Sequence, residues 1–197
     1  MSLEFALDAF PKKLELKGGF SCEARPLEEG DVDAFHEFFL SIPQRELLFL
    51  KNRVTERETI ADWCAKIDFE RNLPLLGVSE GKIVACATLH QQHGGWKRHI
   101  GRVSVLVSKD HRGRGLARAL VTDLVEIARF SGLEHVEAEF AGEQAGEQAG
   151  GTRAFALMGF SQLARFEKYV KDMDAKDHDY VLMGLKLRAD EEYAGMG

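Results

Sequence analysis

The 197-residue sequence contains only three cysteines, Cys22, Cys64 and Cys86. Their number is odd and their spacing matches no metal-ligand pattern, which argues against both a disulfide framework and a structural zinc site. A buried free thiol is therefore the expected state of each cysteine, and no metal is expected.

The sequence also lacks an apolar run close to the roughly 20 residues that a membrane span needs. Its N-terminal region has no charged start, apolar core and small-residue cleavage site, so the expected location is the cytoplasm. Positive charge is scarce as well, since 26 Lys and Arg stand against 32 Asp and Glu, a formal net charge of −6. We therefore expect neither a nucleic acid nor a membrane as a partner.

The composition that remains is typical of a globular protein, with 45% hydrophobic and 29% charged residues. A chain of this length can bury the core of one domain. We predict a single domain over residues 1–197. Its core spans about residues 20–187, and residues 1–19 and 188–197 are peripheral extensions.

The most informative segment is residues 99–132. Val103, Val105 and Val107 alternate with other residues and predict a strand, which runs through a short loop into the glycine-rich stretch 112–117, RGRGLA. A long amphipathic helix pattern follows. A glycine-rich turn between a strand and a helix suits phosphate binding, because unpaired helical N–H groups and the helix dipole attract an anion. Glycine lets the backbone approach the phosphate closely.

The residues of this turn exclude two common phosphate-binding loops. The Walker pattern needs Lys-Ser or Lys-Thr after its last glycine, but Leu116 and Ala117 follow Gly115. The dinucleotide fingerprint needs a small residue where Arg118 stands. The pattern R-x-x-G-x-A, at Arg112, Gly115 and Ala117, instead resembles the pyrophosphate motif of the GNAT superfamily of N-acetyltransferases. The alternative is a solvated basic loop, and it is disfavoured because the motif lies between a strand and a helix.

Periodicity and turn signals predict the order strand, two helices, three strands, helix, strand, helix and two strands. Asp31 is the expected N-cap of the first helix, and Thr55 with Glu58 forms a capping-box pattern before the second. The fold class is α/β, with a mixed, mostly antiparallel seven-stranded sheet flanked by about four helices. GNAT proteins have the same order, so the resemblance covers about residues 20–187. The strands are expected at 20–25, 74–78, 82–90, up to 107, 133–140, 161–170 and 179–187.

The tetrapeptide AGEQ occurs twice in tandem, at 141–144 and 145–148. The repeats directly follow the predicted strand 133–140. In the GNAT pattern the corresponding strand is followed by Asn, Ala, Tyr and Gly-Phe at fixed distances. Without one AGEQ copy, Gln148 takes the Asn position, Gly151 the Ala position and Phe155 the Tyr position. We infer a four-residue insertion beside the coenzyme cleft, either a functional lid or a neutral expansion. Phe155 lacks the hydroxyl with which family members often protonate the departing thiolate.

The resemblance implies an enzyme that transfers an acetyl group from acetyl-CoA, its co-substrate, to a primary amine of a small molecule or protein. Transfer would occur by direct attack in a ternary complex. Backbone amides of the strand that ends at Val107 would hold the pantetheine. Backbone amides of the glycine-rich turn that follows would hold the pyrophosphate. The implied coenzyme-binding residues are Val105, Leu106, Val107, Arg112, Gly113, Arg114, Gly115, Leu116, Ala117, Arg118, Gln148 and Phe155.

A neutral amine must attack, so a base or a water chain has to accept its proton. Glu137 and Glu139 share one face of the predicted strand 133–140 and are the candidate catalytic bases, although a solvated strand face is the alternative for both. His90, His99 and His111 are further options, of which His111 is expected to be a plain loop residue. Trp96 is expected to be a packing or rim residue rather than a platform for substrate.

Two other functions remain open at this point. One is a GNAT module that binds and senses acyl-CoA without turnover, which Phe155 and the AGEQ insertion favour. The other is an acyltransferase for a longer acyl-CoA. The identity of the amine acceptor stays open, and a homodimer is possible because many family members pair through their C-terminal strands.

Overall fold

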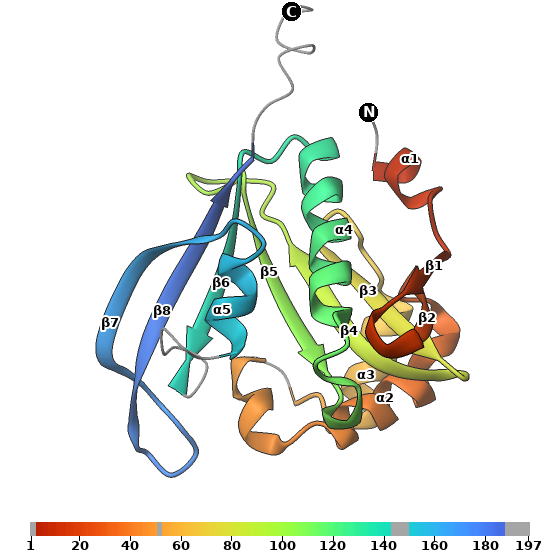
Figure 1. The fold of residues 1–197 in the computed structure, drawn as a ribbon, viewed down its shortest axis with the longest axis horizontal. Helices are drawn as coiled ribbons and strands as arrows, with labels where there is room; N and C mark the ends of the chain where they lie inside the picture. The colour runs from red at the N-terminus through yellow and green to blue at the C-terminus, as the bar shows by residue number, and fades with distance from the viewer. Residues whose placement is uncertain (1–2, 51–52, 143–149, 188–197) are drawn as a thin grey trace, which may run out of the picture.

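A computed structural model describes residues 3–50, 53–142 and 150–187 (Figure 1). Within these ranges, no helix combines the length and the apolar character needed to cross a membrane. The helices are α1 (Leu3–Leu7), α2 (Val32–Ser41), α3 (Arg57–Ala65), α4 (Leu116–Phe130) and α5 (Gly150–Ala156), with a 3₁₀ turn, η3, at Gln44–Phe49. The strands are β1 (Lys12–Glu15), β2 (Ser21–Pro26), β3 (Asn72–Ser79), β4 (Lys82–His90), β5 (Ile100–Val107), β6 (His135–Ala141), β7 (Ser161–Lys171) and β8 (Asp177–Lys186).

The strands form one sheet in the order β1-β2-β3-β4-β5-β6-β8-β7. Neighbouring strands are antiparallel except β5 and β6, which run parallel. The sheet is therefore mixed and mostly antiparallel, as expected, but the predicted number of seven strands is wrong. The additional strand is β1, which pairs with β2 from Lys12 opposite Ala24 to Glu15 opposite Ser21. The four residues of β1 include one buried apolar side chain, Leu14, which is too few for an alternation of apolar and polar residues to indicate a strand.

Helix α4 begins and ends at two glycines. Gly115 is its N-cap in the left-handed region, with φ of 96°, and Gly132 follows its C-cap with φ of 75°. Leu120, Leu124 and Ile127 lie on the buried side of the helix, which packs against β3, β4 and β5 (Figure 1). The predicted amphipathic helix and its terminating glycine are both confirmed, because a left-handed position after a helix favours glycine.

The sheet separates two apolar clusters, as successive residues of β3 demonstrate. Leu75 packs into the cluster that contains α4, whereas Leu76 packs into the cluster formed with α2 and α3. Alternate side chains of a strand point to opposite faces, so the two clusters cover opposite faces of the sheet. Phe35 and Phe39 of α2 anchor the second cluster, with ring centroids 4.6 Å apart. The sheet therefore fixes the positions of α2 and α4 relative to β5.

Of the two predicted helix caps, the one at Thr55 is wrong, and the one at Asp31 is confirmed in its position but not in its side-chain bond. Helix α3 begins at Arg57, and its N-cap Glu56 makes no side-chain capping bond, so the Thr55 capping box is wrong. The Thr55 carbonyl instead lies 2.9 Å from His36 Nε2. Asp31 does occupy the N-cap position of α2, but its carboxylate does not cap that helix and accepts hydrogen bonds from other groups.

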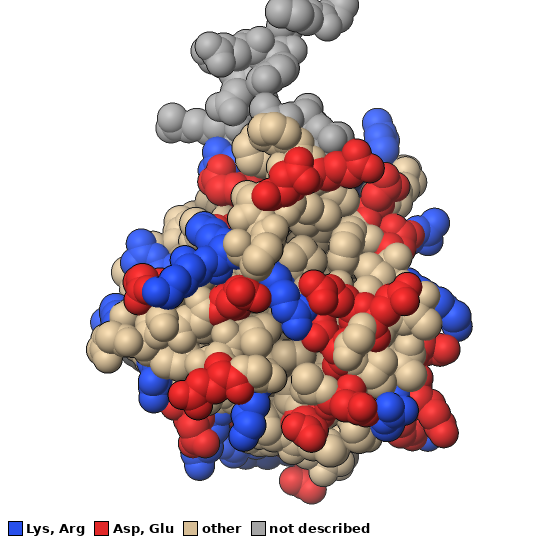
Figure 2. Space-filling model, turned by 90° about the vertical axis from the view of Figure 1, so that its right-hand side faces the viewer, with Lys and Arg blue, Asp and Glu red and all other residues tan. Residues whose placement is uncertain are grey.

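All three cysteines are buried and free, as the sequence predicted. Burial raises the pKa of the Cys22 and Cys64 thiols and raises that of Cys86 to about 12. A thiol in such surroundings stays protonated and unreactive at neutral pH. Figure 2 shows one face of the molecule, on which acidic and basic side chains are interspersed rather than gathered into one basic surface.

Candidate active site

Strands β5 and β6 pair over only three positions and then part. The paired residues are Ile100 with His135, Gly101 with Val136 and Arg102 with Glu137. Figure 1 shows the two strands diverging toward their carboxyl ends. From residue 103 to 107, β5 continues beside β4 while its other edge turns toward the gap. Such an edge presents backbone N–H and C=O groups to an extended ligand.

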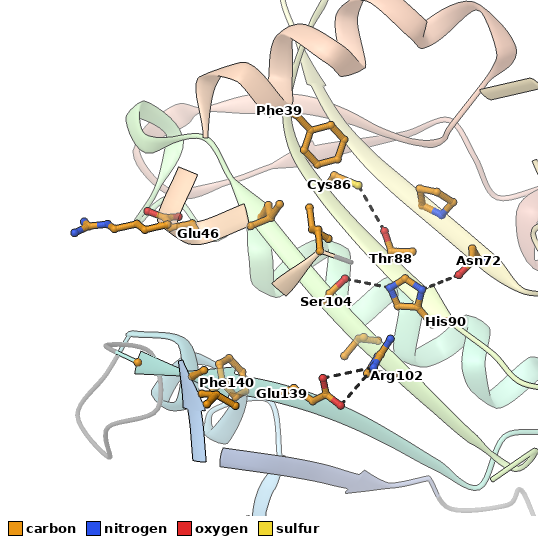
Figure 3. Close-up of a pocket in the computed structure, with 18 of the residues that line it drawn as sticks. Phe39, Glu46, Asn72, Cys86, Thr88, His90, Arg102, Ser104, Glu139 and Phe140 are labelled. Carbon is orange, nitrogen blue, oxygen red and sulfur yellow. Dashed lines mark hydrogen bonds and ion pairs between the residues drawn. The ribbon is translucent and has the colours of Figure 1, made fainter. Parts of the chain in front are cut away.

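A cavity of about 1260 Å³ opens where the strands part. Its walls come from α2, the η3 turn, β3, β4, β5, β6 and the hairpin formed by β7 and β8. Figure 3 shows part of this wall, with His90 of β4, Ser104 of β5 and Glu139 of β6 among the labelled residues. The cavity therefore lies between the first helices and the C-terminal hairpin, on the face of β5 opposite α4.

The loop after β5 has the geometry of an anion-binding turn. Gly113 and Gly115 both lie in the left-handed region, with φ of 76° and 96°. The first α-helical bond of α4 runs from the Ala119 N–H to the Gly115 carbonyl at 3.0 Å, so the N–H groups just before it have no partner within the helix. A Cβ atom on Gly113 would meet no atom within 4 Å, and one on Gly115 only Leu16 at 4.0 Å. Space for a ligand therefore lies outside both glycines.

The arginine side chains of this loop are directed to three different places. Arg112 donates from Nε to the Val107 carbonyl at 3.1 Å and pairs with Glu46 of η3 at 2.6 Å. The Arg114 guanidinium lies 4.7 Å from the centre of the Phe20 ring. Arg118 lines a second, smaller cavity on α4. The three guanidinium groups therefore do not converge on one point, which leaves the backbone N–H groups as the donors that this loop can offer an anion.

Strand β5 divides its side chains between the two faces of the sheet. Leu106 lines the cavity, whereas Val105 and Val107 pack against the cluster around α4. The alternation predicted for this segment is confirmed. Although their side chains point to different faces, Val105, Leu106 and Val107 all lie beyond the last residue of β5 that pairs with β6, so their backbone groups face the gap between the two strands.

Phe155 lies in the core rather than in the described wall of the cavity. Its side chain is 3% exposed, and its ring stands edge-on to Phe140 and Phe160, with centroids 5.0 and 4.9 Å away. Phe140 does line the cavity, so Phe155 supports the wall from behind. Gln148 and most of the duplicated AGEQ segment lie outside the described residues.

The two glutamates proposed as bases have different surroundings. Glu139 lines the cavity and pairs with Arg102 at 3.4 Å (Figure 3). Glu137 pairs with Lys97 at 3.4 Å, and it is not among the described residues that line the cavity. Sequence reasoning missed Tyr180 of β8, which also lines the cavity. Burial, followed by the charge of Glu139 and a hydrogen bond to it, raises the pKa of Tyr180 to about 12.

Among the three histidines considered, the described cavity wall includes His90 alone. Its Nδ1 lies 2.7 Å from Asn72 Oδ1, and its Nε2 lies 3.4 Å from Ser104 Oγ. The His99 ring stands edge-on to His135, and His111 hydrogen-bonds Ser108 at 2.8 Å. Asn72 and Ser104 escaped notice because they are 18 and 14 residues from His90 in sequence.

The hairpin of β7 and β8 closes the other side of the cavity. Asp172 and His178 form a hydrogen bond of 2.7 Å across it, and this bond, with backbone donors, holds the pKa of Asp172 below its ordinary value. Both residues line the cavity. Trp96, by contrast, is 95% exposed, so the packing alternative for its side chain is wrong, and it is not among the described residues that line the cavity.

Comparison with known proteins agrees with this geometry. The model of the acetyltransferase (GNAT) family matches residues 35–160, which is more than half of the chain. No curated protein matches the chain.

Solved structures share the fold at low sequence identity. The GNAT domain of PAT from S. lividans has a TM-score of 0.71 at 19% identity, covering 89% of this chain and 96% of that one. A ribosomal-protein-alanine N-acetyltransferase from Brucella melitensis has a TM-score of 0.68 at 20% identity, covering 83% and 99%. The structure of yncA from Salmonella typhimurium with its cofactor acetyl-CoA has a TM-score of 0.70 at 20% identity, covering 85% and 94%. The resemblance seen in the sequence is confirmed, and the chain belongs to the GNAT acetyltransferase family.

Proposed function

We propose that the protein transfers an acetyl group from acetyl-CoA to a primary amine by direct attack in a ternary complex. The observation that carries this proposal is that β5 and β6 part beside a large cavity. The loop that follows β5 leads into α4, whose N-cap Gly115 is in the left-handed region. Membership of the family and the structural neighbour that holds acetyl-CoA support the same activity.

The residues present fit the coenzyme. The open edge of Val105, Leu106 and Val107 would pair with the amide groups of the pantetheine arm, as one strand pairs with another. The N–H groups from residues 113 to 118 would bind the pyrophosphate, where the helix dipole favours negative charge. The guanidinium of Arg112 already pairs with Glu46, so its role would be to hold the loop against η3. Phe155 would act through Phe140, and Gln148 remains an expectation from the resemblance.

Acetyl-CoA supplies a thioester carbonyl as the electrophile. The acceptor nitrogen forms a bond to the carbonyl carbon, the bond from carbon to sulfur breaks, and the thiolate leaves with a proton. Of the two predicted bases, Glu139 is the one on the cavity wall. Tyr180 keeps its proton at neutral pH and hydrogen-bonds Glu139, so its hydroxyl would have to exchange that partner for the thiolate in order to supply the proton that Phe155 cannot give.

The test is thiol release from acetyl-CoA in the presence of a panel of amines. The panel contains free amino acids, polyamines and a short peptide with a free N-terminal alanine. We expect acetyl-CoA-dependent thiol release with at least one amine and an acetylated product of the matching mass. Tight acetyl-CoA binding without release for any amine would favour the second candidate, a binding module without turnover, which the buried and hydroxyl-free Phe155 supports.

The acyl chain is tested in the same assay. Acetyl-CoA is the proposed acyl donor, so it should give a higher kcat/KM than propionyl-CoA or succinyl-CoA. A preference for either longer chain would assign the protein to a longer-chain acyltransferase.

We also propose that the protein forms a homodimer through β7. This strand is an edge of the sheet and is exposed along most of its length. Leu163 and Tyr169, which are 57% and 67% exposed, place apolar surface there. An unpaired edge with apolar side chains is a surface that proteins usually cover.

A further inference from the structure

Three polar side chains from three adjacent strands meet in the cavity wall. Asn72 of β3 lies opposite His90 of β4 in the sheet register, and Ser104 of β5 lies opposite Thr88, two residues before His90. In Figure 3 the His90 ring stands between Asn72 and Ser104, with hydrogen bonds to both. The strand register therefore holds the imidazole between two fixed partners.

The hydrogen bond to Asn72 determines which ring nitrogen carries the proton. The amide oxygen of Asn72 can only accept, so His90 Nδ1 must donate across their 2.7 Å separation. In a neutral ring the other nitrogen, Nε2, then carries a lone pair and acts as a hydrogen-bond acceptor. Asn72 thus holds the ring in the tautomer that can accept a proton at Nε2.

The accepting nitrogen faces the strand that is proposed to hold the coenzyme. Nε2 lies 3.4 Å from the hydroxyl of Ser104. Ser104 follows Arg102, the last residue of β5 that pairs with β6, by two positions. It therefore lies where the open edge of β5 begins, and a donor that replaced the Ser104 hydroxyl at Nε2 would sit beside the thioester arm.

The charged groups around the ring leave His90 better placed than Glu139 to take a proton. Arg102 lies opposite His90 on β5 and pairs with Glu139, which also accepts the hydrogen bond of Tyr180. Lys66 and Asp68, which follow α3, line the same cavity. Glu139 is therefore paired with a cation and also accepts from a hydroxyl. The Ser104 group that lies 3.4 Å from His90 Nε2 is a neutral hydroxyl.

We propose that His90 is the general base of the transfer and that Asn72 is its positioning residue. This inference rests on the proposed function. The acceptor arrives as an ammonium ion and gives one proton to His90 Nε2. The neutral amine then forms the nitrogen–carbon bond as the carbon–sulfur bond breaks, and its second proton goes to the departing thiolate. The proton on the imidazolium returns to solvent.

The kinetic test compares His90→Gln with Glu139→Gln, using the most active amine of the panel and hydroxylamine. A base contributes on the order of 10² to 10⁴ in rate, so His90→Gln should lose at least about 100-fold in kcat with the alkyl ammonium acceptor. Hydroxylamine is already neutral at the assay pH, so its rate should fall far less. His99→Gln, away from the cavity, should retain the wild-type rate. Full activity in His90→Gln with loss in Glu139→Gln would overturn the proposal.

The positioning role has a readout that does not depend on turnover. In protein with ¹⁵N-labelled histidine, the nitrogen shifts of His90 should show a proton on Nδ1 and none on Nε2. Asn72→Leu should remove that preference and lower kcat, whereas Asn72→Asp, whose carboxylate also accepts from Nδ1, should restore both. A ring protonated on Nε2 in the wild type would overturn this inference alone. Absence of thiol release from wild type with every amine would instead overturn the proposed function.

Discussion

At the residue scale, Asp31 joins the start of α2 to strand β2. Its carboxylate accepts two hydrogen bonds from Arg25, at 2.6 and 2.7 Å, and one from the Glu28 N–H at 2.8 Å. Burial acts to raise the pKa of Asp31, but the bonds from Arg25 and Glu28 outweigh it, so the pKa lies below its ordinary value. The charged form is therefore the one that stabilises the fold.

We predict that Asp31→Asn lowers the free energy of unfolding by about 2 kcal/mol at pH 7, because it leaves a largely buried arginine without its main partner. A carboxyl group whose pKa is lower in the folded state than in the unfolded state stabilises the folded state at pH values above the unfolded pKa, here about 3.9. That stabilisation is lost as the pH falls through the folded pKa. Urea unfolding should therefore show the difference shrinking below about pH 4. Asp62→Asn, at an exposed pair with Lys66, is the control and should change little. A difference independent of pH would contradict this account.

Gly115 gives the second prediction at this scale. In Gly115→Glu the new carboxylate would enter the space outside the helix N-terminus, so coenzyme binding should be lost. A side chain at φ of 96° should cost about 1–2 kcal/mol in stability. Gly132→Glu is the control at the other end of α4. Its φ of 75° imposes a similar backbone strain, but it should bind acetyl-CoA with the wild-type affinity. Calorimetric titration with acetyl-CoA measures both, and retained affinity in Gly115→Glu would refute the phosphate site.

How much of the site the sequence predicts depends on the separation of its parts. The turn at Arg112 and Gly115 is local, so its geometry followed from a few adjacent residues. Arg112 pairs with Glu46 across 66 positions, and His90 meets Asn72 across 18. Such pairs depend on the strand order and register, which periodicity alone does not determine.

At the element scale, the central strands and α4 were predictable because each carries a long, regular apolar pattern. Strand β1 has four residues and a single buried one, too few for a period to show. The T-x-x-E pattern places the start of α3 wrongly, because it predicts a cap only if Thr55 takes the N-cap position, and Glu56 takes it instead. Short elements and helix ends therefore account for the differences in fold.

The pairing of β5 with β6 depends on close packing at Gly101. A Cβ atom there would lie 2.8 Å from methyl carbons of both Leu89 and Leu133, which are buried. We predict that Gly101→Ala costs about 1–3 kcal/mol in thermal or urea unfolding, because neither leucine has room to move.

Gly184→Ala is the matched control. Its Cβ atom would lie 2.5 Å from Leu163, but that side chain is 57% exposed and can rotate into solvent. We expect a cost within about 0.5 kcal/mol. Equal costs at Gly101 and Gly184 would show that close approach in the core is not the cause.

At the scale of the whole molecule, β7 is the surface through which two copies would pair. Light scattering after gel filtration should give a mass near twice the 22.0 kDa of one chain. Phe166→Asp, on β7 and 45% exposed, should shift the protein toward the monomer, while Phe130→Asp on α4, 41% exposed, should not. A monomer at all concentrations would contradict the proposed dimer.

The central claim is that the parted strands and the glycine turn bind acetyl-CoA. The most direct test is isothermal titration of the wild-type protein with acetyl-CoA, with desulfo-CoA and ATP as controls. We predict saturable binding of acetyl-CoA at one site per chain, binding of desulfo-CoA through the same pyrophosphate and pantetheine contacts, and no response to ATP. No response to either CoA species, or an equal response to ATP, would contradict the account.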